Sequence, residues 1–246
     1  LQQPVKKLKI AFSTQSPIGT TVSKDAIDAV HHTARLLESL GPTVVEAQPE
    51  IDGMSLARDF ITTWFSQFSY MLEQIKQHVP TTAGDFELDS LALAAFGAKT
   101  TALEYIHNLN NWGVYVTKMN QFFDHYDHYD LYLTPATASV APKNGQISTP
   151  SWQKPILKSL LKVGKAHLLA QGKLVDKIVK DNLRWVPFTQ LANITGLPAM
   201  SVPLYWNADN LPLGSQFIAP FAREDLLLQL ASQLEQAQPW FHKYSE

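Results

Sequence analysis

The sequence predicts an α/β protein with a mixed β-sheet flanked by helices. The first observation behind this prediction is a strand–helix–strand pattern over residues 8–14, 23–40 and 43–47, which is typical of a parallel βαβ unit. The second is a pair of apolar runs, 199–206 and 213–219, joined by the turn Asn-Ala-Asp-Asn-Leu-Pro, which predicts an antiparallel hairpin with a long loop. A sheet that contains both kinds of pairing is mixed.

The first helix has clear start and stop signals. Ser23 is placed to accept a hydrogen bond at the helix N-terminus, and Asp25 lies in the first turn, where a negative charge suits the helix dipole. Gly41 is suited to end the helix in a left-handed conformation. Apolar residues three or four positions apart predict one buried face: Ile27, Val30, Ala34, Leu37 and Leu40.

The rest of the chain alternates between long helical patterns and short apolar runs. We expect helices over residues 54–79, 88–98, 100–126, 156–179, 188–195 and 223–237, and a buried strand over 130–137. In the helix 100–126, Leu103, Ile106, Val116 and Phe123 are expected near one apolar stripe. Gly164 and Gly172 weaken the helical pattern of 156–179. No linker is visible, so we expect residues 1–246 to form a single α/β unit.

Composition excludes several function classes. The net charge of −2 leaves no basic surplus to neutralise phosphates, so we expect no nucleic-acid partner. No apolar run has the roughly 18 to 20 residues of a membrane-spanning helix, so no membrane partner is expected either. The chain has no cysteine, which excludes disulfides, thiolate zinc sites and a cysteine nucleophile, and fits a cytoplasmic protein.

The stretch Asp-His-Tyr-Asp-His-Tyr-Asp over 124–130 is a candidate metal site. His125 and His128 are three residues apart, as are Asp124 and Asp127, so on a helix each pair could face one side. The alternative is a polar helix C-terminus where histidine suits the dipole. A metal site would need further ligands and supporting contacts, so the polar terminus is the preferred interpretation.

The stretch 187–206 carries three prolines and one glycine among apolar residues, which is typical of an active-site loop. It contains no nucleophile with a base beside it. Ser201 falls in the middle of the predicted strand, where a nucleophile elbow is not expected. The Ser151–Lys154 pair has S-x-x-K spacing, but Pro155 disfavours the helical turn that this motif requires.

Three stretches together resemble the amidase signature family. Residues 188–240 contain Asn-Ile-Thr-Gly-Leu-Pro-Ala, a strand with Val-Pro, the hairpin sequence Leu-Pro-Leu-Gly-Ser-Gln, an acidic-leucine helix and Pro-Trp. Tyr-Asp-Leu-Tyr-Leu-Thr-Pro-Ala-Thr over 129–137 is similar to the family's buried strand and Thr-Pro turn. Residues 8–53 resemble the βαβ entry to its second half. The stretches at 52–65 and 122–135 resemble the branch of 6-aminohexanoate-cyclic-dimer hydrolases.

The resemblance implies an amide hydrolase that uses a serine nucleophile, a second serine and a lysine, with no metal or cofactor. In the family these groups lie in the N-terminal half, within a Gly-Gly-Ser-Ser-Gly-Gly block and at a lysine. This chain contains no Ser-Ser and no Gly-Gly dipeptide, so none of its residues is assigned a catalytic role. It therefore resembles the C-terminal part of a larger amidase domain and is expected to be inactive alone. The implied partners are a small amide substrate, the N-terminal half of the same polypeptide and, through exposed apolar surface, another copy of the chain.

By the same resemblance, two turns would face the catalytic loop and form a substrate-pocket wall. The residues concerned are Thr134 and Pro135 in the first turn and Asn193, Ile194, Thr195 and Gly196 in the second, with Trp64 as a possible third wall. The alternative is a purely structural role for both turns and a core position for Trp64. Two other functions stay open: a non-catalytic binding or scaffold module, and an amidotransferase subunit.

Overall fold

The computed structural model describes residues 7–126, 128–166 and 173–244. Their contacts divide the chain into two compact units. The first is built from the ranges 1–53, 113–141 and 183–246, and the second from 54–112 and 142–182. Both units are therefore discontinuous in sequence, which explains why no single linker is visible between them. The expectation of one α/β unit within a larger domain stays a prediction.

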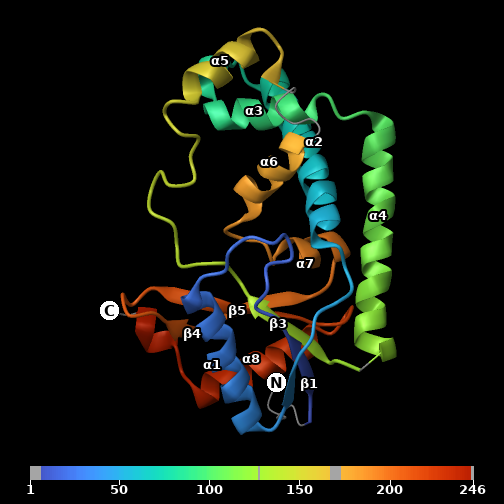
Figure 1. Ribbon diagram of the computed structural model, residues 1–246, viewed down its shortest axis with the longest axis vertical. Helices are drawn as coiled ribbons and strands as arrows, with labels where there is room; N and C mark the ends of the chain where they lie inside the picture. Colours follow the sequence, from blue (N-terminus) through green and yellow to red (C-terminus); the bar gives the residue numbers. More distant parts are fainter. Residues whose placement is uncertain (1–6, 127, 167–172, 245–246) are drawn as a thin grey trace. The chain divides into compact units, whose positions relative to one another are not determined.

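The first unit contains a five-stranded sheet of order β2-β1-β3-β5-β4. Its strands are β1 (Lys9–Phe12), β2 (Thr43–Glu46), β3 (Leu131–Pro135), β4 (Ala199–Trp206) and β5 (Pro212–Ile218) (Figure 1). β1 pairs in parallel with both β2 and β3, whereas β5 is antiparallel to both β3 and β4. The predicted mixed α/β sheet, with its βαβ unit and its hairpin, is confirmed.

Helix α1 (Lys24–Leu40) begins and ends where its sequence signals predict. The Ser23 hydroxyl accepts a hydrogen bond of 3.2 Å from the backbone N–H of Ala26. Gly41 has a left-handed φ of 112°, and its N–H donates to the carbonyl of Glu38. Val30, Ala34 and Leu37 of the predicted face are buried. Residues at the two ends of this helix therefore determine where it begins and ends, independently of its packing contacts.

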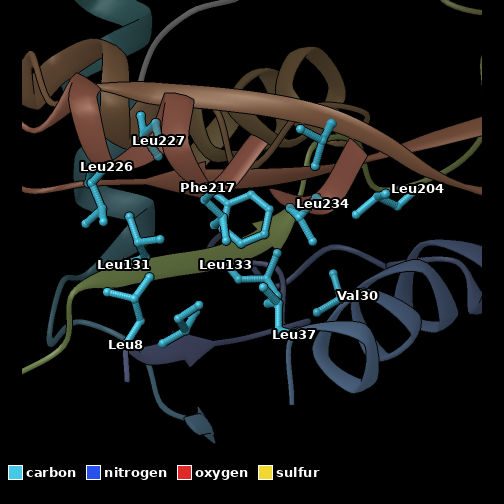
Figure 2. Packing of buried hydrophobic residues seen from close by; sticks show 14 residues of the cluster. Leu8, Val30, Leu37, Leu131, Leu133, Leu204, Phe217, Leu226, Leu227 and Leu234 are labelled. Atoms are coloured by element: carbon cyan, nitrogen blue, oxygen red, sulfur yellow. The ribbon is translucent and has the colours of Figure 1, made fainter. Parts of the chain in front are cut away.

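One face of the sheet is covered by α1 and α8 (Glu224–Ala237). Figure 2 shows Leu131 and Leu133 of β3 and Phe217 of β5 among the leucines of α8 and the Leu37 side chain of α1. The four leucines predicted to point inward from α8 are all buried: Leu226, Leu227, Leu230 and Leu234. Burying a side chain as large as a leucine contributes about 1.5–3 kcal/mol, so this face provides much of the core of the unit.

The opposite face of the sheet has a second apolar cluster. Tyr132 and Ile218 point to this side, where they pack with residues of α7 (Gln190–Thr195), the end of α4 (Ala102–Gln121) and the π-helical turn Phe122–Tyr126. β3 is buried on both faces, which explains why its sequence is continuously apolar rather than alternating.

The second unit is helical. It contains α2 (Gly53–His78, from Met54 onward), the short helix Ala83–Asp85, α3 (Leu88–Gly97), α5 (Lys154–Lys162), the first turns of α4, and α6 (Lys173–Leu183, to Asn182). α3 packs closely on α2 at Gly97, where an added Cβ would lie 1.9 Å from the carbonyl oxygen of Phe65. The Arg58 guanidinium forms two hydrogen bonds with Asp176, at 2.7 and 2.9 Å, and so joins α2 to α6.

Two expectations for the helices are wrong. The single helix predicted over 156–179 is broken, because α5 ends at Lys162 and Gly164 takes a left-handed φ of 69° that cannot continue a helix. Gly172 lies outside the described residues. In α4, Leu103 and Ile106 are exposed, whereas Tyr115 and Met119 are buried. Of the other two residues of the predicted stripe, Phe123 is buried and Val116 is half-buried, so the expectation fails only for the first turns of α4.

Candidate functional site

The carboxyl end of β3 is held by a buried hydrogen-bond network. Gln216 on β5 lies directly opposite Thr134 in the strand register. The Gln216 side-chain amide donates to Thr134 Oγ1 at 3.2 Å and to the carbonyl oxygen of Phe188 at 3.3 Å. Thr134 Oγ1 in turn donates to the carbonyl of Pro135 at 3.1 Å. Gln216 therefore connects the end of β3 to the chain entering α7.

The conformation of the second predicted wall is determined by its glycine. Gly196 follows α7 with a left-handed φ of 65°, and its N–H donates to the carbonyl of Ala192 at 2.9 Å. The carbonyl of Pro198 then accepts a hydrogen bond from the N–H of Ala219, which aligns the chain for β4. The backbone conformation alone accounts for a glycine at this position.

The side chains of this loop differ in exposure. Ile194 and Thr195 are buried, and the Thr195 hydroxyl donates to the carbonyl of Leu191 at 2.7 Å. Asn193 is exposed, and its side-chain amide donates to the carbonyl of Thr189 at 2.8 Å. The Asn193 side chain and the Gly196 backbone are thus the parts of the loop that face solvent in this chain.

The strand register relates the two predicted walls. Thr134 on β3 and Ser201 on β4 both lie opposite Gln216 on β5. β4 begins at Ala199, two residues before Ser201. The hydrogen bonds given above join the Thr134 turn to Phe188, at the start of the 188–196 segment, rather than to Asn193 or Gly196. The first wall is therefore tied to the entry of α7 and the second lies at its exit.

A second pair of polar side chains lies near the Thr134 turn, one on β3 and the other directly after β1. Tyr132 is buried under α7, and its hydroxyl forms a hydrogen bond with Ser13, the residue that follows β1. Burial raises the pKa of Tyr132 above its usual value, and the hydrogen bond with Ser13 acts in the opposite direction. Ser13 also donates to Gln48 Oε1 at 3.2 Å.

Trp64 lies on α2 in the second unit. Its half-buried ring stacks on Phe60 with centroids 6.3 Å apart and contacts Phe65 at 5.5 Å. These are the contacts of a packed aromatic row, and its role as a wall stays a prediction.

Sequence reasoning missed the part played by Gln216 and Tyr132. A signal for Gln216 was present, because it is the last residue of the Leu-Pro-x-Gly-x-Gln pattern. A signal for Tyr132 was not, because a tyrosine within an apolar strand is indistinguishable from an ordinary core aromatic.

One carboxylate of the candidate metal stretch 124–130 has a structural role. Asp130 Oδ2 accepts a hydrogen bond of 2.8 Å from the backbone N–H of Lys9, at the start of β1. Asp124 and His128 are exposed, whereas the His125 side chain and Asp127 lie outside the described residues. Within the part of the chain that is described, no three His, Asp or Glu side chains gather as metal ligands, and no helix is long and apolar enough to cross a membrane.

Comparison with known proteins gives one consistent result. A family model described as Amidase matches residues 1–228. The chain is 32% identical to a lipoamidase of Enterococcus faecalis, over 92% of this chain and 31% of that protein. It is 26% identical to a 6-aminohexanoate-cyclic-dimer hydrolase of Pseudomonas sp. (strain NK87), over 95% of this chain and 44% of that protein.

The fold comparison agrees. The structure of a 6-aminohexanoate cyclic dimer hydrolase complexed with substrate matches 97% of this chain and 46% of its own, with a TM-score of 0.76 and 23% identity. The chain thus spans less than half the length of these relatives.

Proposed function

This chain belongs to the amidase family, and on that premise we propose that it is the C-terminal portion of a hydrolase that cleaves a carbon–nitrogen amide bond. The observation that carries the proposal is the family match over residues 1–228. The relatives are more than twice as long as the matched segment, which supports a parent protein with a further half.

In this proposal the chemistry is divided between two parts of one polypeptide. The Ser-Ser-Lys triad and the oxyanion-binding loop lie in the N-terminal half, because this chain has no Ser-Ser and no Gly-Gly dipeptide. A serine needs an adjacent base to act as a nucleophile, and the developing oxyanion needs preorganised donors, so the missing block is required for turnover. The present chain contributes the sheet core and one side of the pocket.

The pocket wall is proposed at the carboxyl end of β3 and at the exit of α7. Open α/β sheets bind ligands beside the carboxyl ends of their strands, which is where Thr134 and Pro135 lie. The network centred on Gln216 keeps this end rigid, as a substrate-positioning surface requires. Asn193 and Gly196 offer the exposed polar groups of the second wall, Ile194 and Thr195 hold that wall in place, and Trp64 is retained as a third wall.

The proposed substrate is a small linear or cyclic amide. The relatives are named as a lipoamidase and as 6-aminohexanoate-cyclic-dimer hydrolases, which supports a pocket for an amide with an aliphatic chain. The proposed enzyme needs no metal or cofactor. The absence of cysteine fits the cytoplasmic location that we propose for it.

The test compares the purified 246-residue chain with a longer polypeptide that carries it behind an amidase N-terminal half. Both are incubated with linear and cyclic amides and with a fluorophosphonate, and amine release and the adduct mass are measured. We expect turnover and a serine adduct in the longer polypeptide alone. Turnover with an adduct in the short chain would disprove the placement of the catalytic residues in the N-terminal half. Absence of turnover in the longer polypeptide would disprove the proposed amide hydrolase activity.

A further inference from the structure

The helical unit contains a cavity of about 890 Å³ whose lining comes from α2, the short helix Ala83–Asp85, α3 and α5. Its walls are mostly apolar, with Leu72 from α2, Phe86, Leu88 and Leu91 around α3, and Leu161 from α5. This size lies within the range of roughly 300–1,000 Å³ that is usual for small-molecule sites. The lining includes none of the residues of the proposed pocket wall.

The polar part of the lining is strongly basic. Lys154, Lys158 and Lys162 are spaced four residues apart on α5, so they form one stripe along the helix, and all three line the cavity. Lys76 of α2 also lines it, and Glu73 is the single carboxylate among the lining residues.

This stripe has no compensating charge of its own. Like charges at a spacing of four residues repel, and α5 carries no Asp or Glu to offset them. Lys76 lies 4.0 Å from Glu73, so the one carboxylate of the lining is already shared with a lysine. Among the residues that line the cavity, lysines therefore outnumber carboxylates by three.

We propose that this cavity binds a free long-chain carboxylate. The alkyl chain packs against Leu72, Leu88 and Leu91, and the carboxylate lies among the ammonium groups of Lys154, Lys158 and Lys162. Such a ligand matches both halves of the lining, because an apolar chain replaces water along the leucines and a single anion relieves the repulsion of the stripe. A neutral amide would use the apolar wall and leave the three lysines unmatched.

The site is tested by binding, so the result does not depend on amide hydrolysis. The 246-residue chain is titrated with 11-(dansylamino)undecanoate, and the fluorescent probe is then displaced by dodecanoate or by dodecanol. We expect saturable 1:1 binding and displacement by dodecanoate at a concentration roughly tenfold or more below that of dodecanol, because the alcohol lacks the anion. Affinity should fall as salt is raised.

Three variants locate the ligand. The triple substitution Lys154→Gln, Lys158→Gln and Lys162→Gln should weaken dodecanoate binding roughly tenfold and leave dodecanol unchanged. Ala98→Trp, at an exposed position of the lining, should block both ligands by filling the cavity. Lys177→Gln removes an exposed lysine of α6 outside the lining and should change neither. Circular dichroism and thermal melting confirm that each variant is folded.

The proposal is overturned if folded chain fails to bind the probe, or if dodecanol competes as well as dodecanoate. It is also overturned if the triple variant binds dodecanoate like the wild-type chain. Binding to anionic phospholipid vesicles without displacement of the probe by free dodecanoate would identify a membrane-surface patch instead of this site.

Discussion

The side-chain amide of Gln216 donates a hydrogen bond to Thr134 Oγ1 across the β3–β5 pair, at a distance of 3.2 Å. The same amide reaches the carbonyl of Phe188, so one residue holds two chain segments that are distant in sequence. Both side chains are buried. Loss of the amide would remove the donor that Thr134 Oγ1 and the Phe188 carbonyl share, and removing one partner of a buried hydrogen bond is costly.

Gln216→Leu should therefore lower the free energy of unfolding by about 1–3 kcal/mol, the usual cost of an unsatisfied buried polar group. Urea unfolding monitored by tryptophan fluorescence measures it. Gln236→Leu is the matched control, because Gln236 is exposed on α8, and it should change stability by less than about 0.5 kcal/mol. Equal effects of the two substitutions would contradict a positioning role for Gln216.

Gly97→Ala should destabilise the helical unit by about 1–3 kcal/mol or more, because the new methyl group would lie 1.9 Å from a backbone oxygen that cannot move without its helix. The control is Gly113→Ala within α4, where nothing lies within 4 Å of the added Cβ. That substitution should stabilise the protein by about 0.5–1 kcal/mol through helix propensity. Thermal melts of the two variants should shift in opposite directions, and a shared direction would refute the close contact between α2 and α3.

The Arg58–Asp176 pair predicts a pH effect. Hydrogen bonds from the Arg58 guanidinium hold the pKa of Asp176 below its ordinary value of 3.8. Because the pKa is lowered in the folded state, the pair stabilises the fold above the ordinary pKa and loses this contribution as the pH falls through the lowered value. The pair is exposed, so the effect on stability is small and the titration is the better measurement.

In Arg58→Gln, the pKa of Asp176 should rise towards 3.8, as measured by the carboxyl ¹³C shift in an NMR titration. Arg35→Gln on α1, in the other unit, should leave the Asp176 titration as it is in the wild type. An Asp176 pKa that is the same with and without Arg58 would show that the pair does not form in solution.

Asn193→Ala tests the proposed pocket wall in the longer amidase polypeptide. Asn193 is exposed and its amide bonds only the preceding turn, so stability should change by about 1 kcal/mol or less. If the side chain faces substrate, kcat/KM for the best amide should fall about tenfold or more, which one lost hydrogen bond to a bound ligand accounts for. Gln77→Ala on α2 serves as the exposed control. Unaltered kinetics in Asn193→Ala would remove this residue from the wall.

The elements that the sequence predicted well are those fixed by neighbouring residues. Ser23, Gly41 and the inward leucines of α8 all act within a few positions of themselves, so periodicity and end signals locate them. The first part of the stripe predicted for 100–126 is wrong for the opposite reason. Leu103 and Ile106 have helical spacing, but whether a face is covered depends on elements elsewhere in the chain.

The candidate site could be predicted only in part. Resemblance pointed to the turns at Thr134 and Gly196. The left-handed φ of Gly196 is a conformation that favours glycine, which agrees with the residue found there. The link between Thr134 and the entry of α7 runs through Gln216, whose partners Thr134 and Phe188 are 82 and 28 residues away. Contacts between residues so far apart in sequence leave no local sequence pattern that would predict them. The division of the chain into two interleaved units is unpredictable for the same reason.

The placement of β3 beside β1 also sets the order in which the chain can fold. The backbone of Lys9 is bonded to Asp130, 121 residues later, and β3 pairs next with β5 near the end of the chain. Closing such long loops costs entropy before any contact is gained, so a sheet with this connectivity forms slowly. During synthesis, β1, α1 and β2 leave the ribosome long before the strands that complete their sheet. Until β3 and β5 are synthesised, β1 therefore has no partner from this chain on the side away from β2.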